Sequence, residues 1–344
     1  MNRRRRLWIA VLLIVLAAIG ILVRILVFPP SPEPYGRLLI TRSENGTGRS
    51  YWLDPADGSL VTVPRVQYLG RPDLSPDGSQ VVYSGWPGLY IYDLTTHTVQ
   101  QITDAERDSH AVWSPDGRSI IFVNSRDFFS ALYRYDVVSG QRQQLTDYQN
   151  DLEPDWSPDG QRVVFTTSRD GFQELYTMRP DGTDLQRLTN NTGLNDLLAR
   201  YSPDGRTIAY MTNYSVGDDS GEIWVMNADG TQQRQITRNS YYDSQPIWSP
   251  NGRYIVFTGA TPDTSTDLFV YDFQTEFVRQ ITAQPTIDAA PVWSPDSEWI
   301  AFVSYTADGL QSRIYIVRPD GSSLRPLVAE HRGYSLDLWM PASQ

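Results

Sequence analysis

The chain has 344 residues, in which 29 basic side chains face 40 acidic ones, for a formal net charge of −11 at pH 7. All the basic residues are Arg and there is no Cys, which excludes a Schiff-base lysine, a P-loop, a disulfide framework and a thiolate metal site. Five Arg and no acid lie in residues 1–28, so the remainder is strongly acidic and argues against a nucleic-acid partner.

Residues 7–28 form an apolar segment behind a basic tail, residues 1–6, which contains four consecutive Arg. In a helix these 22 residues would span roughly 33 Å, enough to cross a bilayer core of about 30 Å. A cleaved signal peptide is the alternative, but its apolar region is shorter and ends in a small-x-small site, which is missing here. We therefore predict a retained single-pass transmembrane helix, a signal-anchor in the cell membrane. Residues 1–6 would be cytoplasmic and the chain after Phe28 periplasmic or extracellular.

Residues 29–36 are rich in proline and predict a short, extended linker. Beyond this linker a motif recurs in six copies, each with a Ser-Pro turn, usually Ser-Pro-Asp-Gly, followed by an apolar strand. The turns begin at Ser75, Ser114, Ser157, Ser202, Ser249 and Ser294. The spacing of 39 to 47 residues between copies is typical of the blades of a β-propeller.

Each copy predicts four antiparallel strands. In the copy around Trp113 they are residues 111–113, 119–125, 131–137 and 141–146. Before the first copy, residues 37–63 supply three further strands, and the C-terminal segment YSLDLWMPAS aligns its Trp339 with the motif aromatic of the other copies. This segment should supply the missing first strand. We predict an all-β, seven-bladed propeller over residues 37–344, closed by pairing of both ends of the domain so that no strand edge is left free.

The W-S-P-D-G-x-x-I-x-F turn and strand, the L/I-Y-x-x-x-x-D-G third strand and the closing R-Q-I/L-T resemble the TolB-type, WD-like propeller repeat. The resemblance covers about residues 37–341, and the several near-copies make it specific for the fold. It implies a propeller that works outside the cytoplasm and binds partner proteins.

Two sets of repeated residues have a structural interpretation. We expect the motif aromatics to form the core between neighbouring blades: Trp113, Trp156, Tyr201, Trp248 and Trp293. An Asp recurs five positions before the aromatic: Asp108, Asp151, Asp196, Asp243 and Asp288. Five carboxylates near one channel mouth could hold a cation, but a residue repeated in nearly every blade is more simply a loop cap that accepts backbone N–H groups. We expect neither a metal site nor a cofactor.

The candidate binding residues lie three positions before the motif aromatic, where the loops meet the mouth of the channel. That position is polar in four blades, as Arg71, His110, Glu153 and Gln245. The first three belong to adjacent blades, so we expect them in one sector of the mouth. A cation, a neutral-to-cationic imidazole and a carboxylate could bind an acidic or amide-bearing partner segment there. The alternative is an ion pair that seals the mouth.

The sequence contains no nucleophile elbow, zinc-protease, dinucleotide-binding or EF-hand motif. The triplet Asp219-Ser220-Gly221 is similar to that of aspartic proteases but lies in a polar loop. We therefore predict no catalytic residues and no enzyme. The predicted function is a membrane-anchored scaffold that binds a protein or peptide partner at the channel mouth. A propeller-type lyase or other enzyme, and a purely structural subunit of an envelope complex, are the alternatives.

Overall fold

The computed structural model describes residues 34–44, 47–64, 69–214, 220–239, 241–262, 265–331 and 333–341. The predicted cytoplasmic tail, transmembrane segment and residues 29–33 of the linker lie outside the described residues. In the part of the chain that is described, no helix is long and apolar enough to cross a membrane. The fold below is that of the unit Tyr35–Gln344.

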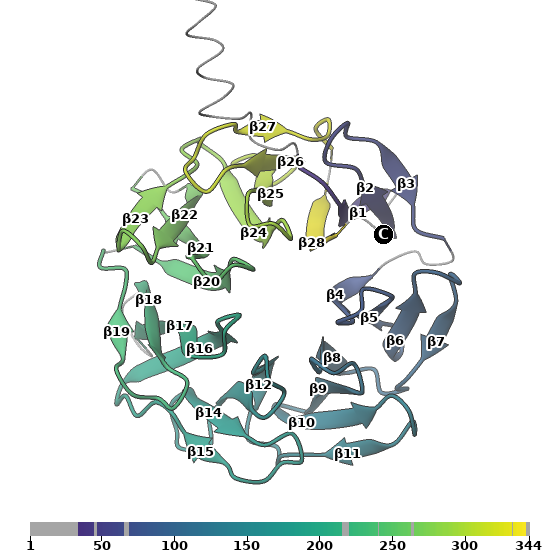
Figure 1. The fold of residues 1–344 in the computed structure, drawn as a ribbon, viewed down its shortest axis with the longest axis vertical. Helices are drawn as coiled ribbons and strands as arrows, with labels where there is room; N and C mark the ends of the chain where they lie inside the picture. The colour runs from purple at the N-terminus through teal and green to yellow at the C-terminus, as the bar shows by residue number, and fades with distance from the viewer. Residues whose placement is uncertain are drawn as a thin grey trace, which may run out of the picture. The chain divides into compact units, whose positions relative to one another are not determined.

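The described residues form antiparallel sheets that surround a common centre (Figure 1). Three sheets are built from successive strands. The first contains β4 (Gly70–Leu74), β5 (Gln80–Gly85), β6 (Gly88–Asp93) and β7 (Val99–Gln101), and the second contains β8 (Asp108–Trp113), β9 (Ser119–Arg126), β10 (Phe129–Asp136) and β11 (Arg142–Gln144). The third contains β12 (Leu152–Trp156), β13 (Val163–Thr167), β14 (Glu174–Met178) and β15 (Gln186–Arg187). A fourth contains β16 (Leu194–Tyr201), β17 (Thr207–Tyr214), β18 (Gly221–Asn227) and β19 (Arg234–Gln235).

The next sheet has eight strands: β20 (Asp243–Trp248), β21 (Tyr254–Ala260), β22 (Thr266–Asp272), β23 (Phe277–Gln280), β24 (Ile287–Trp293), β25 (Ile300–Tyr305), β26 (Ser312–Val317) and β27 (Arg325–Pro326). Its two halves are antiparallel meanders that share a buried cluster. Between their described strands, the one ladder pair is that of Thr266 in β22 with Ile287 in β24, in parallel. The last sheet combines β28 (Tyr334–Met340) with β1 (Arg37–Glu44), β2 (Thr47–Leu53) and β3 (Leu60–Thr62).

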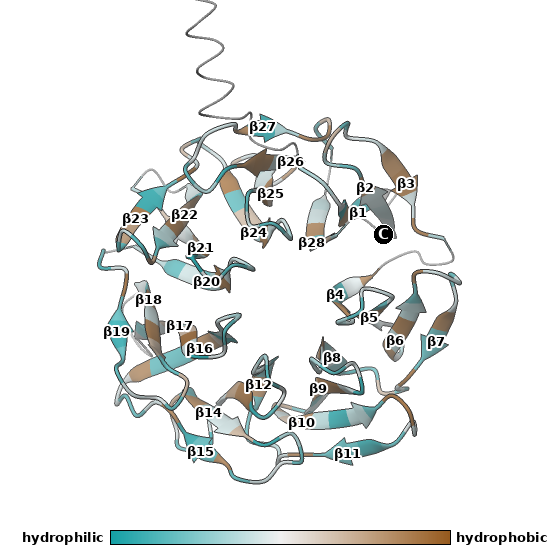
Figure 2. Ribbon diagram, in the orientation of Figure 1, coloured by the Kyte–Doolittle hydropathy of each residue, from teal (hydrophilic) through white to brown (hydrophobic). Residues whose placement is uncertain are grey.

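The strands nearest the common centre in Figure 1, which we call the inner strands, are β4, β8, β12, β16, β20, β24 and β28. All but β28 end in a Ser-Pro turn, and we call that end of the sheet the turn end and the opposite end the mouth end. Second strands such as β9 and β13 are buried along nearly their whole length. They are covered on both faces by neighbouring sheets, which explains their continuous apolar sequence. The outermost strands, such as β7 and β11, are exposed and hydrophilic (Figure 2). The predicted all-β fold of four-stranded antiparallel sheets around a centre is confirmed for the five sheets that have four strands, and the sixth sheet has eight.

The C-terminal strand completes the N-terminal sheet. β28 pairs antiparallel with β1 from Met340 opposite Arg37 to Tyr334 opposite Arg42. Trp339 is buried in the cluster that contains Leu38 and Leu336, and its indole N–H donates a hydrogen bond of 2.8 Å to the carbonyl of Tyr35. The predicted pairing of the two ends of the domain is confirmed.

The Ser-Pro-Asp-Gly turns explain why the repeat is so regular. In the turn at Ser114 the hydroxyl donates to Asp116 Oδ1 at 2.6 Å and accepts the N–H of Ser119 at 2.9 Å. Gly117 has a φ of +69°, and a Cβ at this position would lie 3.7 Å from the ring of Pro76 in the preceding turn. The turns therefore contact each other from sheet to sheet, in addition to closing their own hairpins.

The motif aromatics join neighbouring sheets, as predicted. The indole N–H groups of Trp156, Trp248 and Trp293 donate to backbone carbonyls of the preceding inner strand, at 3.3, 3.1 and 3.1 Å. The acceptor in each case is the residue just before the preceding aromatic. Because these rings are also largely buried against apolar neighbours, they act as structural anchors and not as a ligand cage.

Candidate functional site

The predicted binding positions share one backbone conformation. In each of six inner strands the pairing register shifts at this point, which marks a β-bulge. The residue three before the aromatic has a positive φ in all six: Arg71 46°, His110 51°, Glu153 54°, Leu198 57°, Gln245 57° and Ala290 51°. Sequence reasoning missed these bulges. A signal was available, because Pro follows the position in four of the strands, and within a sheet Pro is confined to edges, strand starts and bulges.

Three of the predicted residues line one cavity. Arg71, His110 and Glu153, from β4, β8 and β12, surround a space of about 350 Å³. This cavity, which we call the mouth pocket, is also lined by residues that sequence reasoning missed, Asp73, Arg200 and Asp337 among them. Gln245 lies at the same bulge position in β20, where it is exposed, and does not line the mouth pocket.

The acidic side chains of the mouth pocket are held by backbone groups of the next sheet. Asp73 Oδ2 accepts the N–H of Trp113 at 2.7 Å, and Asp155, which follows the pocket residue Pro154 but does not itself line the pocket, accepts the N–H of Tyr201 at 2.8 Å. Glu153 Oε2 accepts the N–H of Leu198 at 3.1 Å. These carboxylates therefore join one sheet to the next.

Burial dominates the titration of two acids in the mouth pocket. It raises the pKa of Asp73 to about 7, against the lowering effect of its hydrogen bond from Trp113. Burial also raises the pKa of Asp337 to about 7, although the Thr41 hydroxyl donates to Asp337 Oδ2 at 3.3 Å. Both acids therefore keep their protons to a higher pH than ordinary carboxyl groups do, and the negative charge of the mouth pocket is smaller than its composition indicates.

The cations of the mouth pocket make no ion pair with the described residues. The charge of Arg200 nevertheless acts on the nearby acids: burial raises the pKa of Asp155 and of Asp73, and Arg200 opposes that rise in both. Arg71 is exposed and makes no hydrogen bond or ion pair with the described residues. The Arg200 side chain donates to the carbonyl of its neighbour Ala199 at 2.8 Å and has no salt bridge within the described part of the chain. Two guanidinium groups thus face the cavity without an anionic partner in direct contact.

His110 differs from the sequence expectation in its charge. Burial, with the positive charges of Arg71 and Arg200, lowers the pKa of the imidazole to about 4. Its Nδ1 lies 3.0 Å from the hydroxyl of Ser109. The expected neutral-to-cationic imidazole is therefore a neutral one at ordinary pH, and the positive charge of the mouth pocket comes from arginine alone.

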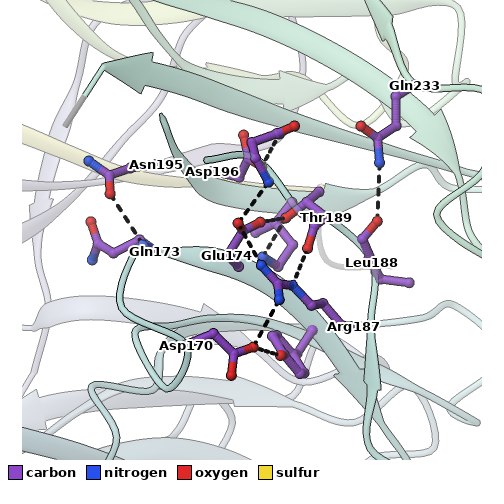
Figure 3. A network of polar contacts seen from close by, with 12 residues as sticks. Asp170, Gln173, Glu174, Arg187, Leu188, Thr189, Asn195, Asp196 and Gln233 are labelled. Atoms are coloured by element: carbon purple, nitrogen blue, oxygen red, sulfur yellow. Dashed lines mark hydrogen bonds and ion pairs between the residues drawn. The ribbon is translucent and has the colours of Figure 1, made fainter. Parts of the chain in front are cut away.

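The repeated Asp residues belong to buried polar networks, one of which is shown in Figure 3. Asp196 accepts Asn191 Nδ2 and Thr212 Oγ1, both at 2.7 Å, beside Glu174, which accepts Arg187 at 2.9 Å. The equivalents at other positions accept Asn124, Arg169, Asn239 and Ser304. These carboxylates tie loops in place as expected, but their donors are side chains and not the expected backbone N–H groups.

No group of three or more His, Asp or Glu in the described residues could hold a metal ion. Asp219, from the triplet similar to that of aspartic proteases, lies outside the described residues. Two larger cavities lie elsewhere. One, of about 770 Å³, is lined by Trp52, Leu94 and His97 among others, and one of about 600 Å³ is lined by Gln144 and Leu185 among others. Neither contains a predicted binding residue.

Comparison with known families supports the repeat analysis. Residues 148–264 and 200–344 match the model of the TolB beta propeller domain, and together these ranges cover more than half of the chain. Residues 75–153 match the N-terminal region of dipeptidyl peptidase IV.

Two curated relatives have been described only in general terms. An uncharacterized peptidase of Bacillus subtilis, YuxL, is 37% identical over 59 residues, which are 17% of this chain and 9% of that protein. The uncharacterized protein Atu1656 of Agrobacterium fabrum is 28% identical over 243 residues, 68% of this chain and 66% of that protein. The chain thus spans less than two thirds of the length of either relative.

Solved structures share the fold. TolB from Acinetobacter baumannii superimposes with a TM-score of 0.57 at 20% identity, covering 90% of this chain and 83% of that one. Oligogalacturonate lyase from Vibrio parahaemolyticus gives a TM-score of 0.68 at 16% identity, covering 82% and 86%. At such identities the likeness concerns the fold, which binding proteins and enzymes both use.

Proposed function

Because the chain belongs to the TolB beta propeller domain family, we propose that it is a membrane-anchored binding scaffold for a protein or peptide partner outside the cytoplasm. Residues 7–28 would be the anchor. We read the fold as seven blades, six of four successive strands each and a seventh of β28 with β1–β3. The single pair that joins β22 to β24 supports reading the eight-stranded sheet as two blades.

The observation that carries the proposal is the division of charges in the mouth pocket. Asp73 and Glu153 are engaged by backbone N–H groups of the next sheet, and Asp337 accepts the Thr41 hydroxyl. Arg71 and Arg200, by contrast, have no salt bridge within the described residues. Guanidinium groups bind carboxylates and amide oxygens through charge-assisted hydrogen bonds. The ligand that fits is therefore an acidic or amide-bearing segment of a partner.

The connection to the proposed anchor is compatible with such a role. β1 begins at Arg37, opposite Met340 at the end of β28, so the chain enters the propeller at its turn end. The mouth pocket lies among the bulges near the start of the inner strands, toward the other end.

An enzyme is the second candidate. Its specific support is the neutral imidazole of His110, which faces two guanidinium groups in the mouth pocket, together with the fold shared with a lyase. A neutral imidazole can act as a general base, although a pKa of about 4 makes it a weak one near pH 7. Under this alternative a His110→Gln variant would lose turnover of a small acidic substrate.

The test is quantitative capture of crosslinked partners from native membranes by the full chain. Arg71→Ala should weaken capture about tenfold, or ~1.4 kcal/mol, and should change the free energy of unfolding by less than about 0.5 kcal/mol, because Arg71 has no partner to lose. Arg118→Ala, an exposed Arg in a turn at the opposite end, is the matched control. Equal capture by both variants would contradict the proposal.

Glu153 requires a separate variant. Removing its carboxylate leaves the N–H of Leu198 without its acceptor, at a cost of about 1–3 kcal/mol if that group stays buried. Glu153→Gln keeps an acceptor oxygen and should be nearly as stable as the parent chain. Comparing Glu153→Ala with Glu153→Gln therefore separates the loss of the hydrogen bond between sheets from the loss of any contact with the partner.

A further inference from the structure

Four exposed aromatic side chains lie on three adjacent sheets, although others, such as Tyr241 and Tyr242, lie elsewhere. Three of the four occupy the loops that join the second strand to the third in the β4–β7, β8–β11 and β12–β15 sheets, and the fourth, Phe129, is the first residue of β10. The exposed fractions are 72% for Trp86, 90% for Phe128, 53% for Phe129 and 36% for Phe172. We call these four residues the aromatic arc. Protein surfaces rarely expose clustered apolar side chains, and where they do, the cluster often marks an interaction site.

The aromatic arc lies at the mouth end, in the same three sheets that supply Arg71, His110 and Glu153. The loop of Phe128 touches the segment that leads into β8, since Arg107 donates to the carbonyl of Asp127 at 3.3 Å. The loop of Phe172 is tied in the same way to the segment before β12, where Ser168 N donates to the carbonyl of Gln149 at 3.1 Å. The arc and the mouth pocket are therefore on one side of the propeller.

Two of the aromatic side chains, those of Trp86 and Phe128, lie on tight two-residue turns. Gly85 pairs with Gly88 across a turn whose two central residues are Trp86 and Pro87. Arg126 pairs with Phe129 in the same way, which leaves Phe128 at the tip of a two-residue turn. An aromatic side chain on a tight hairpin has little conformational entropy to lose on binding, and Trp is also common among binding hot spots.

Charges around the aromatic arc favour a protein over a lipid surface. Basic and acidic side chains are mixed in these loops and the segments beside them: Asp104, Glu106, Arg107, Arg126, Asp127, Asp147, Arg169 and Asp170. An anionic membrane surface selects clusters of basic residues, which such a mixture does not provide. A protein surface with apolar and polar groups matches both the aromatic tips and the mixed charges.

We propose that the aromatic arc and the mouth pocket form one continuous binding surface, and that the partner is a segment with an acidic or amide-bearing residue flanked by apolar ones. The acidic or amide group enters the mouth pocket, and the apolar side chains lie against Trp86 and Phe128. This inference rests on the proposed function and adds the apolar half of the partner.

The test uses random peptides displayed on phage, selected on the full chain in detergent. Selected peptides should combine an acidic or amide residue with apolar neighbours. Synthetic peptides of the selected sequences should bind the Phe128→Ser and Trp86→Ser variants about tenfold more weakly than the parent chain, and the Arg71→Ala variant likewise. Phe277→Ser is the matched control, because Phe277 is 74% exposed but lies at the start of β23, beside a turn-end loop.

The outcomes separate the two proposals. Peptides that depend on Arg71 but not on Phe128 or Trp86 would overturn this inference and leave the proposed function intact. If no selected peptide depends on Arg71, the proposed function fails, and the inference fails with it. Dependence on Arg71 and on both aromatic tips supports the continuous surface.

A second measurement distinguishes lipid from protein. The chain has no Cys, so Phe128→Cys accepts a single environment-sensitive fluorophore. In vesicles of phosphatidylcholine and phosphatidylglycerol, the emission should shift to the blue only when a selected peptide is added. A shift in vesicles without peptide, absent from the Phe277→Cys control, would assign the arc to the membrane and overturn the inference.

Discussion

Deletion of residues 334–344 should destabilise the whole propeller, because it removes β28 and exposes an edge of β1. Tyr334, Leu336 and Trp339 are all buried in the cluster between this sheet and its neighbour. At about 1.5–3 kcal/mol for each large apolar side chain, their loss costs roughly 5–9 kcal/mol. Native domains are stable by only about 5–15 kcal/mol, so the truncated chain should be largely unfolded or melt far below the full chain.

The assay is thermal unfolding of the full and truncated chains in the same detergent, followed by near-ultraviolet circular dichroism. Deletion of residues 342–344 alone keeps β28 and should leave the midpoint unchanged. Trp339→Phe keeps most of the apolar contact but loses the hydrogen bond to the carbonyl of Tyr35, so it should cost about 1 kcal/mol. A chain without residues 334–344 that melts like the full one would refute the closure argument.

Two further predictions concern the pocket and the turns. The pKa of Asp337 is raised to about 7 from an ordinary value of 3.8, so the folded chain keeps this proton to a higher pH than the unfolded chain does. The free energy of unfolding contributed by this group therefore falls as pH rises from about 4 to about 7. Asp337→Asn removes this titration, and its melting temperature relative to the parent chain should rise between about pH 4 and pH 7; a constant difference would contradict the assignment. Ser114→Ala removes both hydrogen bonds of the hydroxyl in its turn and should lower the free energy of unfolding by about 1–3 kcal/mol in urea titrations. An unchanged midpoint would show that the hydroxyl adds nothing.

The features that could be predicted depend on short stretches of sequence. The turn at Ser114, the buried second strands and the pairing of β28 follow from turn chemistry and from hydrophobic patterns within one repeat. Arg200 and Asp337 were missed because they lie at other offsets from the aromatic than Arg71 does. The bulges change which positions of an inner strand reach the pocket, and this depends on pairing between strands.

The charge of His110 could not be predicted for a related reason. Its neutral state depends on burial and on Arg71 and Arg200, which lie 39 and 90 residues away in the sequence. Likewise the engagement of Glu153 by the N–H of Leu198 requires the next sheet to be in place. Sequence patterns placed the candidate residues in three consecutive repeats, whereas their protonation and their partners depend on contacts between repeats.

The bulge conformation at the channel mouth has a consequence for how recognition can diversify. A positive φ costs a residue other than Gly, Asn or Asp roughly 1–2 kcal/mol, and six inner strands accept it with side chains as different as those of Arg71, Leu198 and Ala290. The surrounding sheets thus impose the backbone shape whatever side chain is present. The same backbone shape therefore presents a different side chain in each of the six strands. If the mouth binds a partner as we propose, a substitution at one of these positions changes the chemistry of the mouth while the scaffold stays constant.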